Sequence, residues 1–242
     1  MNNGKRVVIT GLGVISPVGN DIATFWDSLK SGRCGIGPLT GMDLHGLPIH
    51  VAGNIKDFDP SAFGLSGADK RRNDLYSQYA LAAASQVMKS SGLVSGENIE
   101  PERFGVYAGT GIGGMNTFVS QTKVLLEEGA DRISPLFIPM MIPNIAGGNI
   151  AIKYNAQGPC LTHVSACATS TNSIGEAYLA VSYGRADAIL TGGSEAVLNP
   201  LAIGGFANCK ALTTEEDPSK ACRPFDKDRG GFVMAEGAAF LM

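Results

Sequence analysis

Short apolar runs and amphipathic stretches alternate along the chain. Residues 7–10 form a β-branched run that Gly11 closes, which predicts a strand followed by a turn. Asn20 and Asp21 then precede an amphipathic stretch that ends at Gly32. Side chains of this type accept hydrogen bonds from the free N–H groups of a first helical turn, so the stretch predicts a helix. The chain therefore begins as strand, turn and helix.

The same alternation continues to the last residues. Further helices are predicted over residues 73–90, 116–128, 144–154 and 167–184, and strands over residues 104–108, 160–165, 188–191 and 231–242. Strands that alternate with helices in this way are typical of a layered α/β fold. No fixed-period repeat or linker divides the chain, which predicts one domain. The last strand is still apolar at Met242, so we expect a fragment or one half of a two-part core.

Two stretches depart from the alternation. Residues 31–70 are rich in Gly, Pro and Asp and predict an irregular excursion. Residues 134–143 carry three prolines and six large apolar side chains. This second stretch is too apolar for a solvated loop, and we expect another surface to pack against it.

The charge of the chain excludes several classes of partner. The 242 residues include 19 Lys and Arg and 22 Asp and Glu, for a formal net charge of −3. Nucleic acids and anionic membranes are bound by clustered basic residues, so neither is an expected partner. No apolar stretch is long enough to predict a membrane span, and the N-terminal residues lack the apolar region of an export signal.

The cysteines and histidines argue against structural cross-links. Five cysteines, without a C-x-x-C pair, do not predict a disulfide framework or a zinc site. Three histidines without an acidic cluster do not predict a metal site. We therefore expect no metal, no cofactor and a reducing, cytoplasmic location.

Cys167 falls where a predicted strand meets a predicted helix. Free N–H groups and the helix dipole stabilise a thiolate there, which makes this cysteine a candidate nucleophile. A backbone N–H at the same turn can stabilise the oxyanion formed by attack on a carbonyl. The alternative is a buried cysteine that packs as a small hydrophobic residue. His163 lies four residues earlier, but on a strand we expect its ring to pack and hydrogen-bond rather than to act as a base.

Two glycine-rich turns match nucleotide-binding motifs only in part. Ser16 stands where the third glycine of a dinucleotide fingerprint beginning at Gly11 is needed. The sequence GTGIGG at residues 109–114 follows a predicted strand but lacks the Lys-Ser/Thr of a P-loop. These glycines are better explained by close backbone packing around a site. The basic run at residues 70–72 is either solvated surface or a docking point for an acidic partner.

Several motifs, taken together, resemble the N-terminal half of the beta-ketoacyl-[acyl-carrier-protein] synthases, condensing enzymes of the thiolase-like family. They occur in order as VVITGLGVISPVG at residues 7–19, GTGIGG at 109–114, GP at 158–159, SACATS at 165–170, GGSEA at 192–196, GGF at 204–206, RPFDKD at 223–228 and GFVMAEG at 231–237. The similarity is greatest to the type II elongating synthases of bacterial fatty acid synthesis. It implies an α/β, thiolase-like fold: a mixed five-stranded sheet with helices on both faces, one half of the family's αβαβα core.

The resemblance also implies roles for single residues. Cys167 would be the nucleophile that accepts an acyl chain from acyl carrier protein as a thioester, with its N–H as half of the oxyanion hole. Ile112 matches the position that bounds the depth of the acyl pocket. Phe137 matches a region that reaches the partner subunit's pocket in the family homodimer. The residues that would face the acidic carrier protein are Lys70, Arg71, Arg72 and, at a second place, Lys210.

The family reaction has a second stage for which this sequence lacks the expected groups. Malonyl-acyl carrier protein is decarboxylated, and its carbanion attacks the thioester. The family supplies two histidines, a lysine and a Gly-rich loop for this stage from its C-terminal half, and His163 matches neither histidine. We therefore expect residues 1–242 to be an N-terminal half that lacks the C-terminal half, is poorly stable alone and can at best acylate itself.

Other interpretations stay open. The chain could be a non-catalytic scaffold that binds acyl carrier protein, or half of a split synthase. It could act as a type II polyketide ketosynthase, or as a thiolase-like acyltransferase that uses coenzyme A. A cysteine at position 167 argues against chain-length-factor relatives, which replace the nucleophile.

Overall fold

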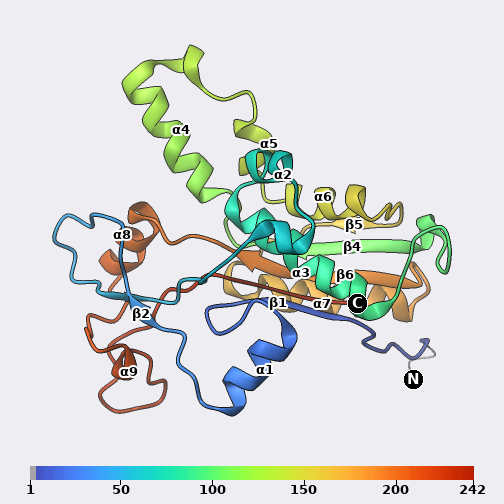
Figure 1. The fold of residues 1–242 in the computed structure, drawn as a ribbon, viewed down its shortest axis with the longest axis horizontal. Coiled ribbons are helices and arrows are strands. Elements are labelled where there is room, and N and C mark those ends of the chain that lie inside the picture. Colours follow the sequence, from blue (N-terminus) through green and yellow to red (C-terminus); the bar gives the residue numbers. More distant parts are fainter. Residues whose placement is uncertain (1–3) are drawn as a thin grey trace.

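The computed structural model describes residues 4–242, and at its centre lies one mixed five-stranded sheet (Figure 1). Its strands lie in the order β1 (Leu12–Ile15), β7 (Gly237–Leu241), β6 (Ala188–Glu195), β4 (Phe104–Gly109) and β5 (Cys160–Leu161). β4 pairs in parallel with β5 and β6, whereas β7 runs antiparallel to both β6 and β1. The carboxyl ends of the three parallel strands therefore meet at one edge of the sheet. The implied mixed five-stranded sheet is confirmed.

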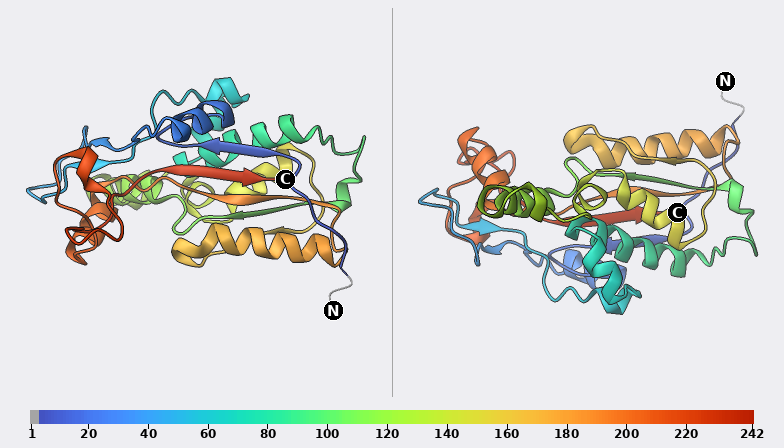
Figure 2. Two further views of the ribbon diagram at one scale, coloured as in Figure 1. Left: turned by 90° about the horizontal axis from the view of Figure 1, so that it is seen from below. Right: turned by 90° about the horizontal axis from the view of Figure 1, so that it is seen from above.

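Helices cover both faces of this sheet, as expected. α3 (Leu75–Ser91) and α6 (Ile145–Lys153) pack on one face, and α7 (Thr169–Ser182) packs on the other (Figure 2). α3 contacts β1, β7 and β6, while α6 contacts β4 and β5. α7 lies along β4 and β6, with its outer side exposed. Each face of the central strands is thus shielded by at least one helix.

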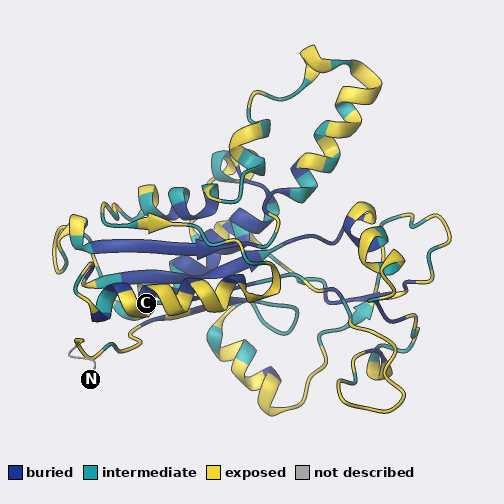
Figure 3. Ribbon diagram, turned by 180° about the vertical axis from the view of Figure 1, so that it is seen from behind, coloured by how far each residue is buried: buried dark blue, intermediate teal, exposed yellow. Residues whose placement is uncertain are grey.

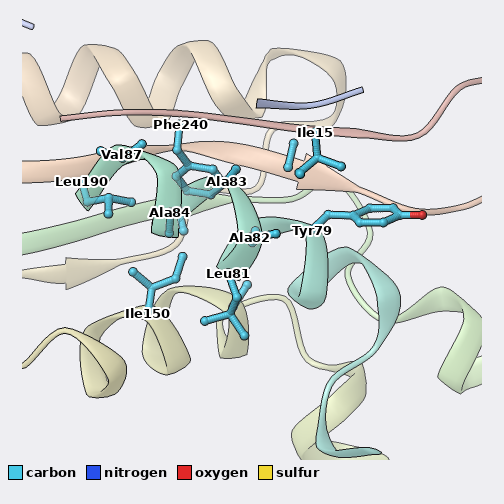
Figure 4. Close-up of a cluster of buried hydrophobic side chains, with 14 of the residues drawn as sticks. Ile15, Tyr79, Leu81, Ala82, Ala83, Ala84, Val87, Ile150, Leu190 and Phe240 are labelled. Carbon is cyan, nitrogen blue, oxygen red and sulfur yellow. The ribbon is translucent and has the colours of Figure 1, made fainter. Parts of the chain in front are cut away.

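α3 is the centre of the main hydrophobic core (Figure 4). Residues 79–84 are each at most 3% exposed. Most of them are alanine, and their small side chains let the helix approach the sheet, where Leu190 and Phe240 are also buried. Burying a side chain of the size of Leu190 or Phe240 contributes roughly 1.5–3 kcal/mol to the free energy of unfolding. The predicted helix over 73–90 is confirmed, and it ends at Gly92 with a left-handed φ of +66°.

The first predicted strand is wrong in position. Residues 7–10 form no strand, and β1 begins at Leu12. Leu12 pairs with Leu241, the last residue of β7, so residues 7–10 have no strand beside them in this register. They line a cavity of about 1010 Å³ next to β6 instead. β-branched residues favour a strand only where a neighbouring strand packs against them.

The remaining elements form the periphery. They are α1 (Ile22–Lys30), β2 (Gly37–Pro38), β3 (Val51–Ala52), η1 (Pro60–Phe63), α2 (Gly67–Arg72), η2 (Pro101–Arg103), α4 (Met115–Glu128), η3 (Ala130–Arg132), α5 (Phe137–Met141), η4 (Ala166–Ala168), α8 (Pro200–Asn208) and α9 (Pro218–Ala221). α1 begins as predicted, because Asp21 accepts a hydrogen bond from Thr24 N at 2.9 Å. The excursion over 31–70 holds only short elements, also as predicted. No helix in residues 4–242 is both long and apolar enough to cross a membrane.

α4 and α5 form an arm that extends from the sheet (Figure 3). Leu126 on α4 is 80% exposed and Ile138 on α5 is 53% exposed. α5 contacts α4 and α6. The surface expected to cover residues 134–143 is therefore only partly supplied by the described chain.

Glu236 is a half-buried carboxylate that links α3 to the start of β7. Its Oε2 accepts hydrogen bonds from Tyr79 Oη at 3.3 Å and from Ile55 N at 3.4 Å. Burial raises the pKa of Glu236, and the two hydrogen bonds lower it by less. The folded protein therefore binds this proton more tightly than the unfolded chain does. Its contribution to stability is present at acid pH and is lost as the pH rises through the raised pKa.

We expect Glu236→Gln to remove this part of the pH dependence. Urea unfolding of both proteins from about pH 4.5 to about pH 7 gives the two free energies of unfolding. The difference, wild type minus variant, should fall as the pH rises. Parallel stability curves would show that Glu236 does not titrate differently in the folded state.

Candidate active site

Cys167 lies at a strained turn between β5 and α7. β5 ends at Leu161, the chain then passes the carboxyl edge of the sheet, and η4 leads directly into α7. The strand predicted over 160–165 is therefore shorter than expected. Ala166 has a φ of +51°, a left-handed conformation that is uncommon for alanine. Such strain persists where surrounding contacts hold it, and it is concentrated at functional sites. The Cys167 side chain that follows is exposed, so the alternative of a buried cysteine is wrong.

Hydrogen bonds from α7 hold this turn in place. Ser165 N donates to Thr169 Oγ1 at 2.8 Å, and Asn172 Nδ2 donates to Ser165 Oγ at 2.6 Å. Ala168 N donates to Ser165 O at 3.2 Å. Thr169 is only 3% exposed. These hydrogen bonds hold Ser165 against the first turns of α7. Cys167 lies between Ser165 and Thr169 and is therefore held in place from both sides.

The start of α7 offers free hydrogen-bond donors. Its N-cap residue is Ala168, whose side chain cannot accept a hydrogen bond. Within residues 4–242, the Cys167 N–H donates to no acceptor. The 14-residue helix also directs the positive end of its dipole toward this turn. An oxyanion formed beside Cys167 would be stabilised by this N–H and by the helix dipole.

Two glycines let the sheet approach α7 at this point. Gly109 ends β4, and a Cβ there would overlap the methyl group of Thr169 and lie 2.8 Å from Ser173 Oγ. Gly193 of β6 pairs with Gly109. A Cβ at Gly193 would overlap Ser170 Oγ and lie 2.9 Å from the Gly109 carbonyl oxygen. The prediction that the 109–114 glycines permit close packing around a site is confirmed for Gly109.

The glycine loop, residues 109–114, borders the Cys167 turn. A Cβ at Gly111 would lie 3.6 Å from the Ala166 carbonyl oxygen. Gly113 has a φ of +87°, and a Cβ there would lie 2.8 Å from the Met141 carbonyl oxygen of α5. Ile112 lies between these two closely packed glycines and is 41% exposed. The structure therefore places Ile112 on a loop that is packed beside the candidate nucleophile.

Glu195, the last residue of β6, was not identified from the sequence. Its Oε2 accepts a hydrogen bond from Gly111 N at 2.7 Å, and its Oε1 accepts one from Thr110 Oγ1 at 3.0 Å. Burial raises the pKa of Glu195, whereas the hydrogen bonds from the glycine loop lower it. The available signal in the sequence was a single acid two residues after Gly192-Gly193, next to the apolar run predicted as a strand over 188–191.

The imidazole ring of His163 contacts Ser173 and Tyr107 rather than Cys167. Its Nδ1 lies 3.3 Å from Ser173 Oγ, and its ring centroid lies 5.6 Å from that of Tyr107. This agrees with the prediction of a packed, hydrogen-bonded ring. Among residues 4–242, no three His, Cys, Asp or Glu side chains gather in a way that could hold a metal ion.

Phe137 lies in the arm, at the first turn of α5. It is half-buried, and its ring centroid lies 6.5 Å from that of Phe118 on α4. α5 reaches the glycine loop through its carbonyl groups, since Gly114 N donates to Met141 O at 3.0 Å. Phe137 is therefore connected to the glycine loop by one short helix.

The basic residues lie on two separate elements (Figure 1). Lys70, Arg71 and Arg72 form the last turn of α2, and all three are exposed. α2 begins with a capping box in which Ser66 and Asp69 bond to each other's backbone N–H, so this short helix is well defined. Lys210 follows α8 in a left-handed turn with a φ of +58°.

The sequence matches known proteins along its full length. The family described as beta-ketoacyl synthase, N-terminal domain, matches residues 4–242. The 3-oxoacyl-[acyl-carrier-protein] synthase 2 of Staphylococcus aureus is 46% identical over 242 residues, which are 100% of this chain and 58% of that protein. The enzyme of the same name from Synechocystis is 44% identical over 239 residues, which are 98% of this chain and 57% of that protein. The chain thus spans less than two thirds of the length of these relatives.

Solved structures give the same result. A beta-ketoacyl synthase from Burkholderia phymatum superposes with a TM-score of 0.88 at 29% identity, covering 98% of this chain and 58% of that one. A type II polyketide ketosynthase, solved in complex with its acyl-carrier protein and bound to the hexaketide, gives a TM-score of 0.83 at 31% identity, covering 98% of this chain and 57% of that one. The family match over residues 4–242 spans the sheet, the glycine loop and the Cys167 turn, and this chain belongs to the beta-ketoacyl synthase family.

Proposed function

We propose that Cys167 accepts an acyl chain from acyl carrier protein, as the first stage of beta-ketoacyl-[acyl-carrier-protein] synthesis. The Cys167 turn carries this proposal, because it combines the strained Ala166, an exposed thiol and a free N–H before α7. The identity of 46% to a 3-oxoacyl-[acyl-carrier-protein] synthase 2 supports the class of reaction.

In this step the Cys167 thiolate attacks the carbonyl carbon of the carrier-bound acyl thioester. A new C–S bond forms, and the carbonyl electron pair moves to the oxygen, where the Cys167 N–H can donate to it. The intermediate collapses by breaking the bond to the carrier's sulfur. That sulfur leaves as a thiolate and takes up the proton that Cys167 released. One thioester replaces another, so the exchange balances without a further reactant.

We propose that the second stage, decarboxylative condensation with malonyl-acyl carrier protein, uses groups supplied by a C-terminal half. Loss of carbon dioxide leaves a carbanion, which attacks the acyl carbon and releases the Cys167 thiolate. No side chain among residues 4–242 hydrogen-bonds to the Cys167 sulfur, and His163 is turned toward Ser173. Residues 1–242 would then be the acyl-accepting half of the enzyme.

Fatty acid elongation is the favoured pathway, because the curated relatives at 44–46% identity carry that type of synthase name. The polyketide ketosynthase neighbour, at 31% identity, keeps type II polyketide synthesis as the second candidate. A second copy of the chain is the proposed partner of the arm, whose exposed apolar residues would be covered in a homodimer. The five free cysteines fit a reducing, cytoplasmic location.

Covalent labelling tests the acyl-transfer step. The chain is incubated with a radiolabelled acyl group on acyl carrier protein or, separately, on coenzyme A, and is then resolved by denaturing electrophoresis. We expect label on the chain mainly from the carrier protein. Stronger labelling from coenzyme A would favour a thiolase-like acyltransferase, and no labelling from either would favour the non-catalytic scaffold.

We expect charge reversal on α2 to weaken transfer from the carrier protein. Arg71→Glu with Arg72→Glu should lower the labelling rate about tenfold at low salt, because like charges then face the acidic carrier. The difference should shrink at about 0.5 M salt, where surface charges are screened. Lys89→Glu, at the exposed far end of α3, is the matched control. Equal rates for the double variant and this control would exclude α2 as the docking element.

A further inference from the structure

The glycine loop depends on one carboxylate for its conformation. Gly111 N donates to Glu195 Oε2 at 2.7 Å, and Thr110 Oγ1 donates to Glu195 Oε1 at 3.0 Å. Gly113 N in turn donates to Thr110 Oγ1 at 3.1 Å. The residues on both sides of Ile112 are therefore connected to Glu195, one directly and one through the threonine hydroxyl.

The surroundings leave the loop little room for another conformation. A Cβ at Gly111 would lie 2.8 Å from Glu195 Oε2, so the carboxylate sits directly against the backbone. On the opposite side, Gly113 packs on the Met141 carbonyl group of α5. The loop is thus held between the end of β6 and the arm, with the Ala166 carbonyl group beside it.

Glu195 has no basic side chain as its partner within residues 4–242. Burial, which opposes its charge, is the main influence on its pKa. The N–H groups of the glycine loop and the Thr110 hydroxyl favour the charged form. A carboxylate compensated in this way stabilises the loop conformation that points N–H groups toward it. The charged side chain and the folded loop therefore stabilise each other.

We propose that Glu195 is a positioning residue that fixes the glycine loop, and thereby holds Ile112 where it limits the length of chain that Cys167 can accept. This deepens the proposed function and rests on it. Glu195 touches the loop and not the reacting sulfur, so its effect is on which acyl chain fits rather than on the nucleophile. The residues that transmit the effect are Thr110, Gly111 and Gly113.

Alkylation of Cys167 tests this role without carrier protein. The chain is treated with iodoacetamide or with N-octyl iodoacetamide, and modification of each cysteine peptide is followed by mass spectrometry. The ratio of the octyl rate to the short rate reports how well the site accepts an alkyl chain. Cys34, exposed near Pro218, is the internal reference for reagent quality.

Glu195→Gln retains the size of the side chain, but its amide can accept from only one of the two donors. We expect the octyl-to-short ratio at Cys167 to rise about tenfold, because Ile112 is no longer held where it limits the length of the chain; this factor is the effect of losing one hydrogen bond to a charged group. Thr110→Val removes the same network from the other end and should give the same direction of change. Thr110→Ser keeps the hydroxyl and should restore the ratio, and Glu127→Gln on the exposed face of α4 should not change it.

Hydrogen exchange supplies a second readout. The Gly111 and Gly113 amides should lose protection in Glu195→Gln while α3 amides do not, which separates loop release from general unfolding. An unchanged ratio in the folded Thr110→Val protein overturns the proposal, and so does an equal fall in the rates of both reagents. If acyl transfer from carrier protein fails while the ratio still changes, the proposed function fails and the positioning of the loop stands.

Discussion

Cys167→Ser should abolish acyl transfer to the chain, with a loss of at least about a thousandfold in the labelling rate. A thiol forms the nucleophilic thiolate readily, but a serine hydroxyl needs a base to remove its proton. Residues 4–242 offer none beside Cys167, because the nearest histidine in sequence, His163, lies with its Nδ1 3.3 Å from Ser173 Oγ. The measurement is the initial rate of covalent labelling by radiolabelled acyl carrier protein.

Cys160→Ser is the matched control for this substitution. Cys160 lies in β5, only a few residues before the turn, but its sulfur lies against α6, 3.9 Å from where a Cβ at Gly147 would stand. Cys160 is exposed as a residue, but partial burial of its thiol against α6 raises the pKa of that thiol. Its replacement should leave labelling unchanged. Full labelling of Cys167→Ser, or loss of labelling in Cys160→Ser, would transfer the assignment to another cysteine.

Gly193→Ala should destabilise the fold by about 2–4 kcal/mol, because the new methyl group has no space. It would overlap Ser170 Oγ and lie 2.9 Å from the Gly109 carbonyl oxygen. The serine can rotate away, but the carbonyl belongs to the central strand β4 and cannot. The free energy of unfolding, measured in urea, reports this loss.

Gly175→Ala provides the comparison, because it adds the same methyl group on the exposed face of α7. No atom lies within 4 Å of a Cβ at Gly175, and alanine favours a helix over glycine by about 0.5–1 kcal/mol. We expect this variant to be more stable than the wild type. A Gly193→Ala protein as stable as Gly175→Ala would show that β6 and α7 are not as closely packed as the structure has them.

Much of the fold follows from local sequence patterns. The apolar stripe of α3, its Gly92 end and the Asp21 cap of α1 were predictable because they depend on residues within one or two turns. The position of β1 was not predictable in this way. Residues 7–10 have the composition of a strand, but pairing is decided by β7, more than 200 residues later in the chain.

In the candidate site, too, features that depend on neighbouring residues were predictable and features that depend on distant residues were not. The exposed turn that carries Cys167 was predictable, because its position before a helix is local and its motif resembles that of a family. The left-handed Ala166 and the hydrogen bonds of Glu195 were not. Glu195 contacts residues that precede it by 84 and 85 positions, and no local pattern links a single acid after a strand to a distant glycine loop.

The most direct test of the account is to locate the acyl group itself. The chain is incubated with acyl carrier protein bearing an acyl group of known mass, digested under conditions that preserve thioesters, and analysed by peptide mass spectrometry. We predict one acylated peptide, containing residues 165–170, with the added mass on Cys167. An acyl adduct on any other residue, or none when the carrier protein is fully loaded and the chain is folded, would contradict the assignment of Cys167 as the acyl acceptor.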